Sequence, residues 1–133
     1  MREMLFRGKR VDNGEWEYGC VVEDWSKKNT KPNIKIHNNI GKFAVIPETV
    51  GQYTGLCDKN GKKVFEGDIV IDKYDKEKFG FVGIVIYNPT LTQFQIYSDK
   101  QPDYVVNLGS RRQSVKVLGN IHDNPELVKG GAV

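Results

Sequence analysis

The 133-residue sequence contains only two cysteines, Cys20 and Cys57, and only two histidines, His37 and His122. No Cys or His pair has the close spacing typical of a zinc site or a redox motif. A disulfide between the two cysteines stays an alternative, but we expect free, buried thiols in a reducing compartment. We interpret both histidines as ordinary surface or capping residues and expect neither a metal nor another cofactor.

Long apolar runs are also absent from the sequence. No segment approaches the roughly 20 apolar residues needed to cross a bilayer, so we expect no contact with a membrane. The first residues include Arg2, Glu3 and Arg7 without a long apolar stretch, and we expect no signal peptide. These features predict a cytoplasmic protein.

The sequence lacks the motifs that common catalytic sites require. It has no P-loop, no glycine-rich phosphate turn before a long helix, and no G-x-S-x-G nucleophile turn. Four acidic residues near the middle of the chain allow two interpretations, convergence on a ligand or separate roles in turns and caps: Glu48, Asp58, Glu66 and Asp68. Their spacing matches no calcium loop, so we favour turns and caps. We therefore expect that the protein is not an enzyme.

The composition is that of a folded protein: 38% of the residues are hydrophobic and 28% are charged. The net charge of +3 is too small to indicate nucleic-acid binding by itself. The length suits a single domain over residues 1–133. Two packed lobes, about 1–50 and 51–128 with a seam at Gly41 or at 46–52, are the alternative, and 129–133 should be a frayed tail.

Short strands separated by turns are expected along the whole chain, because no segment has a helical apolar stripe. Asp12-Asn13-Gly14 is typical of a hairpin turn, so 4–23 should form a β-hairpin. In its second strand one face should carry Trp16, Tyr18, Cys20 and Val22, and the other mostly Glu15, Glu17, Val21 and Glu23. Residues 24–33 read as a loop. Further strands are expected at 34–37, 43–46, 53–56, 63–65, 69–71, 79–87, 93–97, 104–106 and 115–118.

Turn residues divide the centre and the end of the chain. Residues 47–51 should form one helical turn, 57–62 a tight turn, and 109–112 a polar turn. Gly80 and Gly83 interrupt the most hydrophobic segment, 79–87, and predict a bulge or a bend at a barrel corner. Asp123-Asn124-Pro125-Glu126 predicts a short closing helix.

Three blocks of the sequence resemble the YopX family of small phage and prophage proteins. They are Phe6–Arg10 with Gly14–Gly19, the central run IPETVGQYTGLCDKNGKKVFEGDIV, and Leu118–Leu127. The resemblance implies a mainly β fold, a small SH3-like barrel with additional N-terminal strands and a short C-terminal helical turn. It implies no assigned activity and supplies no catalytic residues. It also implies an accessory protein that works in the cytoplasm of a bacterial host.

We expect a binding or structural role, with self-association or a phage or host protein as partner. The segment 79–87 carries little charge and would be a liability as an exposed edge, so we expect a homo-oligomer that uses an edge or face of this region.

The alternative is binding of nucleic acid, because basic residues and aromatic rings lie close together in the sequence. The candidate contacts, to nucleic acid or to another partner, are Arg7, Lys9, Arg10, Trp16, Lys27, Lys28, Arg111 and Arg112. Acidic residues interrupt every basic group, so solvated loops with aromatics in the core are the competing interpretation.

Overall fold

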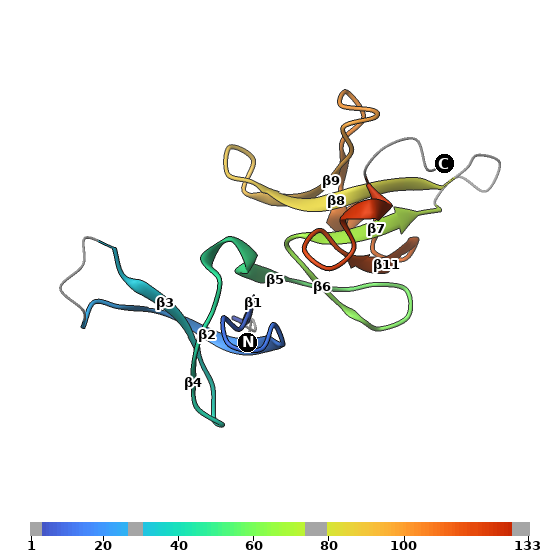
Figure 1. The fold of residues 1–133 in the computed structure, drawn as a ribbon. Coiled ribbons are helices and arrows are strands. Elements are labelled where there is room, and N and C mark those ends of the chain that lie inside the picture. Colours follow the sequence, from blue (N-terminus) through green and yellow to red (C-terminus); the bar gives the residue numbers. More distant parts are fainter. Residues whose placement is uncertain (1–3, 27–30, 74–79, 129–133) are drawn as a thin grey trace. The chain divides into compact units, whose positions relative to one another are not determined.

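The computed structural model describes residues 4–26, 31–73 and 80–128 (Figure 1). Strands account for 51% of the structure and helices for 9%, so the predicted mainly β class is confirmed. The strands form two antiparallel sheets, ordered β4-β3-β2-β1-β5-β6 and β10-β9-β8-β7-β11. In the described ranges both sheets are open, and the closed SH3-like barrel is not confirmed. In this part of the chain no helix has the length and apolar character needed to cross a membrane.

The chain divides into two compact units, Met1–Tyr53 and Thr54–Val133. The first unit contains β1 (Phe6–Lys9), β2 (Trp16–Asp24), β3 (Asn33–His37), β4 (Lys42–Ala44), the 3-10 helix η1 (Pro47–Thr49) and the start of β5 (Gly51–Cys57). The boundary lies inside β5, whose first residues pair with β1. That the units form one packed domain stays a prediction.

The hairpin expected at 4–23 is present as β1 and β2, with Lys9 opposite Trp16. Gly14 takes the left-handed conformation, with φ of 71°, and the Glu15 amide donates to Asn13 Oδ1 at 2.9 Å. β3 and β4 extend this sheet, and the helical turn expected at 47–51 is present as η1.

Among the described residues of the first unit, the buried apolar side chains are Ile36, Val45 and Tyr53. Gly8 packs against Val45 so closely that an added Cβ would lie 3.0 Å from the valine side chain. Ile36 lies opposite Val21 and Phe43 in the sheet, so the buried side chain is on the other face from Tyr18 and Cys20.

Cys20 and Cys57 are not joined in a disulfide, but the prediction that their thiols are buried is wrong, because both residues are exposed. Alternation along β2 correctly separated its two faces, but Tyr18 and Cys20 occupy the exposed one. Cys57 ends β5, where the chain enters a solvent-facing turn.

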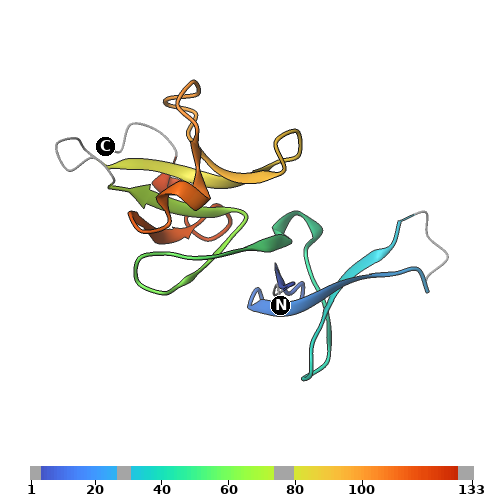
Figure 2. The same ribbon diagram turned by 180° about the vertical axis from the view of Figure 1, so that it is seen from behind.

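The second unit contains the remaining elements (Figure 2). These are β6 (Lys63–Phe65), β7 (Asp68–Asp72), β8 (Phe81–Asn88), β9 (Gln93–Tyr97), β10 (Val106–Asn107), α1 (Leu108–Arg111), β11 (Val115–Asn120) and the 3-10 helix η2 (Pro125–Leu127). Its core lies on one face of the second sheet and consists of Val64, Val70, Val85, Ile96, Val106, Leu108, Val115 and Val117. These side chains come from β6 to β11, so the core ties most of the unit together.

Gly83 serves a close approach between strands, and the prediction of a bulge there is wrong. β8 pairs in regular register with β7 and with β9 around this residue. A Cβ at position 83 would lie 2.7 Å from Ile96 Cγ2 and 2.8 Å from the Tyr97 carbonyl oxygen. The irregularity of this sheet is in β11, between Val117 and Gly119.

The segment after β9 differs from the prediction. Tyr104 and Val105 lie outside the strands, and only Val106–Asn107 pairs with β9. The polar turn predicted at 109–112 is partly the helix α1, which the Asn107 side chain caps by accepting from the Ser110 amide. Leu108, the first residue of α1, is fully buried. Residues 74–79, which include the first residue of the predicted strand 79–87, lie outside the described residues.

Asp58 organises the tight turn at 57–62 and fastens it to the edge strand β11. Asp58 Oδ1 accepts hydrogen bonds from the amides of Asn60 and Lys62, both at 2.9 Å. Its Oδ2 accepts from the Val117 amide at 2.9 Å, and the Lys59 amide donates to the Val115 carbonyl at 3.1 Å. The turn therefore covers backbone groups that an edge strand would otherwise expose.

Candidate functional site

Strand pairing brings several basic side chains to one face of the sheet formed by β1 to β4. Directly opposed residues of an antiparallel pair place their side chains on the same face. Lys9 lies opposite Trp16 and Arg7 opposite Tyr18. Farther along β2, Cys20 lies opposite His37, which lies opposite Lys42, and Val22 lies opposite Lys35. We call this the basic face: Arg7, Lys9, Trp16, Tyr18, Cys20, Val22, Lys35, His37 and Lys42.

The acidic residues of β2 are mostly on the other face. Glu17 and Glu23 alternate with the residues of the basic face. Glu17 Oε1 lies 3.5 Å from Arg10 Nη1, and its Oε2 accepts from Asn38 Nδ2 at 3.2 Å. Positive charge is therefore in excess on the basic face.

Asp24 is the last residue of β2, and alternation along the strand places it on the same face as Val22, on the basic face. Lys35 neutralises its charge there. Lys35 Nζ lies 2.7 Å from Asp24 Oδ2, and the Ser26 amide donates to Oδ1 at 2.9 Å. The bond from Lys35, followed by those from Ser26, holds the pKa of this carboxyl well below its ordinary value. Asp24 thus stays ionised and paired with Lys35.

Three of the candidate contacts predicted from the sequence, Arg7, Lys9 and Trp16, lie together at one end of the basic face. The Arg7 guanidinium lies 4.7 Å from the centre of the Trp16 ring, and Lys9 Nζ lies 5.9 Å from it. Both distances suit cation–π contacts. Arg7 is only 6% exposed, whereas Lys9 and Trp16 are half-buried and retain some surface.

Two other predicted candidate contacts, Arg10 and Arg111, form hydrogen bonds with acidic residues of their own units. Arg10 lies on the opposite side from the basic face, 4.5 Å from the Phe43 ring centre, and donates twice to Asp12 at 2.9 and 2.7 Å. The bond to Asp12 raises the pKa of Arg10 and lowers that of Asp12. Arg111, in the second unit, donates to Asp72 Oδ2 at 3.1 Å.

The remaining selected residues are not part of this group. Arg112 is exposed at the end of α1. Lys27 and Lys28 lie outside the described residues.

Sequence reasoning missed Lys35, His37, Lys42 and Trp25 as candidate contacts. A signal was present, because Lys35 and His37 alternate with Ile34 and Ile36 and so had to face away from the buried side of β3. The sequence did not reveal the strand register that places Lys35 and His37 beside β2 and His37 opposite Lys42.

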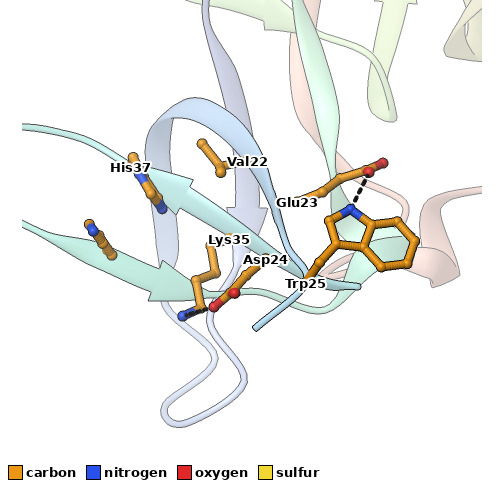
Figure 3. Close-up of a pocket in the computed structure, with 7 residues that line it drawn as sticks. Val22, Glu23, Asp24, Trp25, Lys35 and His37 are labelled. Carbon is orange, nitrogen blue, oxygen red and sulfur yellow. Dashed lines mark hydrogen bonds and ion pairs between the residues drawn. The ribbon is translucent and has the colours of Figure 1, made fainter. Parts of the chain in front are cut away.

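A pocket of about 240 Å³ lies at the far end of the basic face (Figure 3). Its lining consists of Val22, Glu23, Asp24, Trp25, Lys35, His37 and Lys42. Figure 3 shows the Trp25 ring and His37 at opposite sides, with the Lys35–Asp24 pair between them. Trp25 Nε1 donates to Glu23 Oε2 at 3.2 Å, and this tryptophan is 60% exposed. The pocket therefore offers an aromatic ring, an apolar contact and basic groups.

Two of the four central acidic residues, Asp58 and Asp68, have separate backbone partners. Asp58 accepts from three backbone amides, and Asp68 Oδ2 accepts from the Phe65 amide at 2.8 Å. Glu48 lies in the first turn of η1. Across residues 4–26, 31–73 and 80–128, no group of three or more His, Cys, Asp or Glu side chains is placed to hold a metal ion.

Comparison with known proteins gives a family and a fold. The family model described as "YopX protein" matches residues 5–129. The crystal structure of protein EF1440 from Enterococcus faecalis is similar, with 20% sequence identity and a TM-score of 0.55. The match covers 97% of this chain and 100% of that one. A comparison with curated proteins gave no match. Because the family model spans nearly the whole sequence, the chain belongs to the YopX family.

Proposed function

We propose that this protein is a non-catalytic binding module whose basic face binds single-stranded nucleic acid. The observation that carries the proposal is the register of β1 to β4, which gathers Lys9, Lys35, His37 and Lys42 beside aromatic rings. Basic groups that follow a strand's phosphates, with rings on which bases stack, are the usual means of binding single strands.

The exposed rings favour a single strand over a duplex. Tyr18 is 44% exposed and Trp25 is 60% exposed. The π-faces of bases are available for stacking in single strands, whereas in a duplex they are already stacked. An acidic peptide would use the charge of this face but not its aromatic rings.

Family membership supports the setting of this function. We expect proteins of this family to be encoded by phages and prophages. We therefore propose an accessory role in phage replication or regulation, carried out in the bacterial cytoplasm.

The test is fluorescence anisotropy of labelled dT20 at several salt concentrations. If two or three phosphates are neutralised, log Kd should change with log salt with a slope of roughly 1.4 to 2.1. Lys9→Glu and Lys42→Glu should each weaken binding, while Lys100→Glu, at an exposed loop position of the second unit, serves as the matched control. Absence of binding at low salt, or equal weakening by Lys100→Glu, would contradict the proposal.

A second candidate function, self-association, has its own observation in the second sheet. Ile71 lies opposite Val82, which shares a face with Ile84 and Ile86, and all four are half-buried. They lie on the face opposite the core of the second unit. We propose that a second copy of the chain covers this face. Light scattering after size exclusion should show a dimer or larger species, and a strict monomer at tens of micromolar would refute it.

A further inference from the structure

We propose that the pocket at the end of the basic face holds one nucleotide of the bound strand. The base would stack on Trp25, and the adjacent phosphate would contact Lys42 and His37. This inference rests on the proposed function and deepens it, because it assigns a defined subsite to a surface that otherwise binds through distributed charge.

The Trp25 ring is both accessible and oriented. It is 60% exposed, and its Nε1–H group is held by Glu23 Oε2 at 3.2 Å. An aromatic ring fixed before binding loses less conformational entropy when a base stacks on it. Glu23 uses its carboxylate to position the ring and keeps its negative charge, because the indole donor is neutral.

The charges on the side of the pocket formed by β3 and β4 favour an anionic group, whereas Glu23 carries a negative charge on the Trp25 side. Asp24 is neutralised by Lys35 at 2.7 Å. Lys42 and His37 are directly opposed on β4 and β3, and within the described ranges neither forms an ion pair. An ammonium beside an imidazole can donate hydrogen bonds to a phosphate. The two therefore form the part of the pocket suited to a phosphate.

The size of the pocket limits the ligand. Pockets for drug-sized molecules usually measure about 300–1,000 Å³, and this one is about 240 Å³. It suits a single ring system with its phosphate and leaves the rest of a strand to extend along the basic face toward Lys9 and Trp16.

The chain allows a direct spectroscopic test, because Trp16 and Trp25 are its only tryptophans. In a Trp16→Phe variant, Trp25 alone reports the environment of the pocket. Titration with dT10 should quench its fluorescence, and thymidine monophosphate should do so at much higher concentration. An oligoglutamate of the same length should leave it unchanged.

Affinity measurements complete the test. In the otherwise unchanged chain, Trp25→Ala should weaken dT10 binding roughly five- to one-hundred-fold, the range that loss of one stacked base gives. Trp25→Phe should restore part of the affinity, and Lys42→Ala should weaken binding while reducing its salt dependence. Thermal unfolding of each variant should match the original chain, because Trp25 and Lys42 are exposed.

Two results would overturn the inference in distinguishable ways. If dT10 binds the Trp25→Ala variant with unchanged affinity and leaves the fluorescence of Trp25 unchanged in the Trp16→Phe variant, the pocket is not the subsite while strand binding stands. If dT10 does not bind the original chain at low salt, both the subsite and the proposed function are wrong. Equal quenching by oligoglutamate would also reject a nucleotide subsite, in favour of an acidic peptide.

Discussion

Replacement of Asp58 by alanine should destabilise the second unit more than any loop substitution of similar size. The side chain is 6% exposed and accepts three backbone hydrogen bonds, from Asn60, Lys62 and Val117. Water can replace the bonds within the exposed turn, but the Val117 bond is buried, and an unsatisfied buried amide costs about 1–3 kcal/mol. With the weakened turn added, we expect the free energy of unfolding to fall by about 3 kcal/mol.

That loss should lower Tm by roughly 10 °C for a chain of this length. Both tryptophans lie in the first unit, so far-UV circular dichroism is the appropriate probe of the second. Asp58→Asn keeps one acceptor oxygen, so its Tm should lie between those of the original chain and of Asp58→Ala. Asp103→Asn, at an exposed loop position, should leave Tm unchanged. An Asp58→Ala variant with the Tm of the original chain would refute the role given to this carboxylate.

The same residue predicts a pH dependence with a defined sign. Burial alone would raise the pKa of Asp58, but hydrogen bonds from the amides of Val117, Lys62 and Asn60 outweigh it, and the pKa is lowered. The stabilisation by ionised Asp58 is therefore present above the unfolded pKa of about 3.9 and is lost as pH falls through the lower, folded value. The stability difference between the original chain and Asp58→Asn should shrink in that acidic range. A difference that stays constant down to the acid transition would contradict this assignment.

The remaining predictions concern packing, capping and accessibility. Gly83→Ala should destabilise the protein by about 1–3 kcal/mol in urea titration, because its Cβ would meet Ile96 and the Tyr97 carbonyl oxygen; wild-type stability would show that the strands can separate there. Asn107→Ala should cost about 1–2 kcal/mol, because α1 loses its side-chain cap and Gln93 loses a hydrogen bond from Asn107; Asn107→Ser should restore only the cap. Cys20 and Cys57 should both react with a thiol reagent in the native protein, whereas a single fast-reacting thiol would contradict their exposure.

Much of the local structure could be predicted because turn residues have direct conformational consequences. Gly14, Gly61 and Gly67 all take positive φ, as expected from the turns in which they lie. Alternation identified β2 and β3, and Pro47 marked η1. In each case the relevant interaction is within a few residues, so the sequence contains the information that determines it.

The rest depends on which strands are neighbours. Alternation divided β2 into two faces but did not indicate that Cys20 lies on the exposed one. Gly83 was expected at a bulge, and only the packing of Ile96 and Tyr97 shows that its role is close approach. Only part of the candidate site could be predicted from the sequence. Lys35, His37 and Lys42 join Lys9 and Trp16 only through the register of four strands, which the sequence does not reveal.

The position of the unit boundary inside β5 affects how this protein can be cut or recombined. A boundary in a loop can be nicked by proteases or used as a fusion point, but here the backbone passes through a hydrogen-bonded strand. Division at residue 53 would leave each fragment with an incomplete strand. Fusions or truncations that interrupt the chain at residue 53 should therefore destabilise both fragments, because each would lack part of β5.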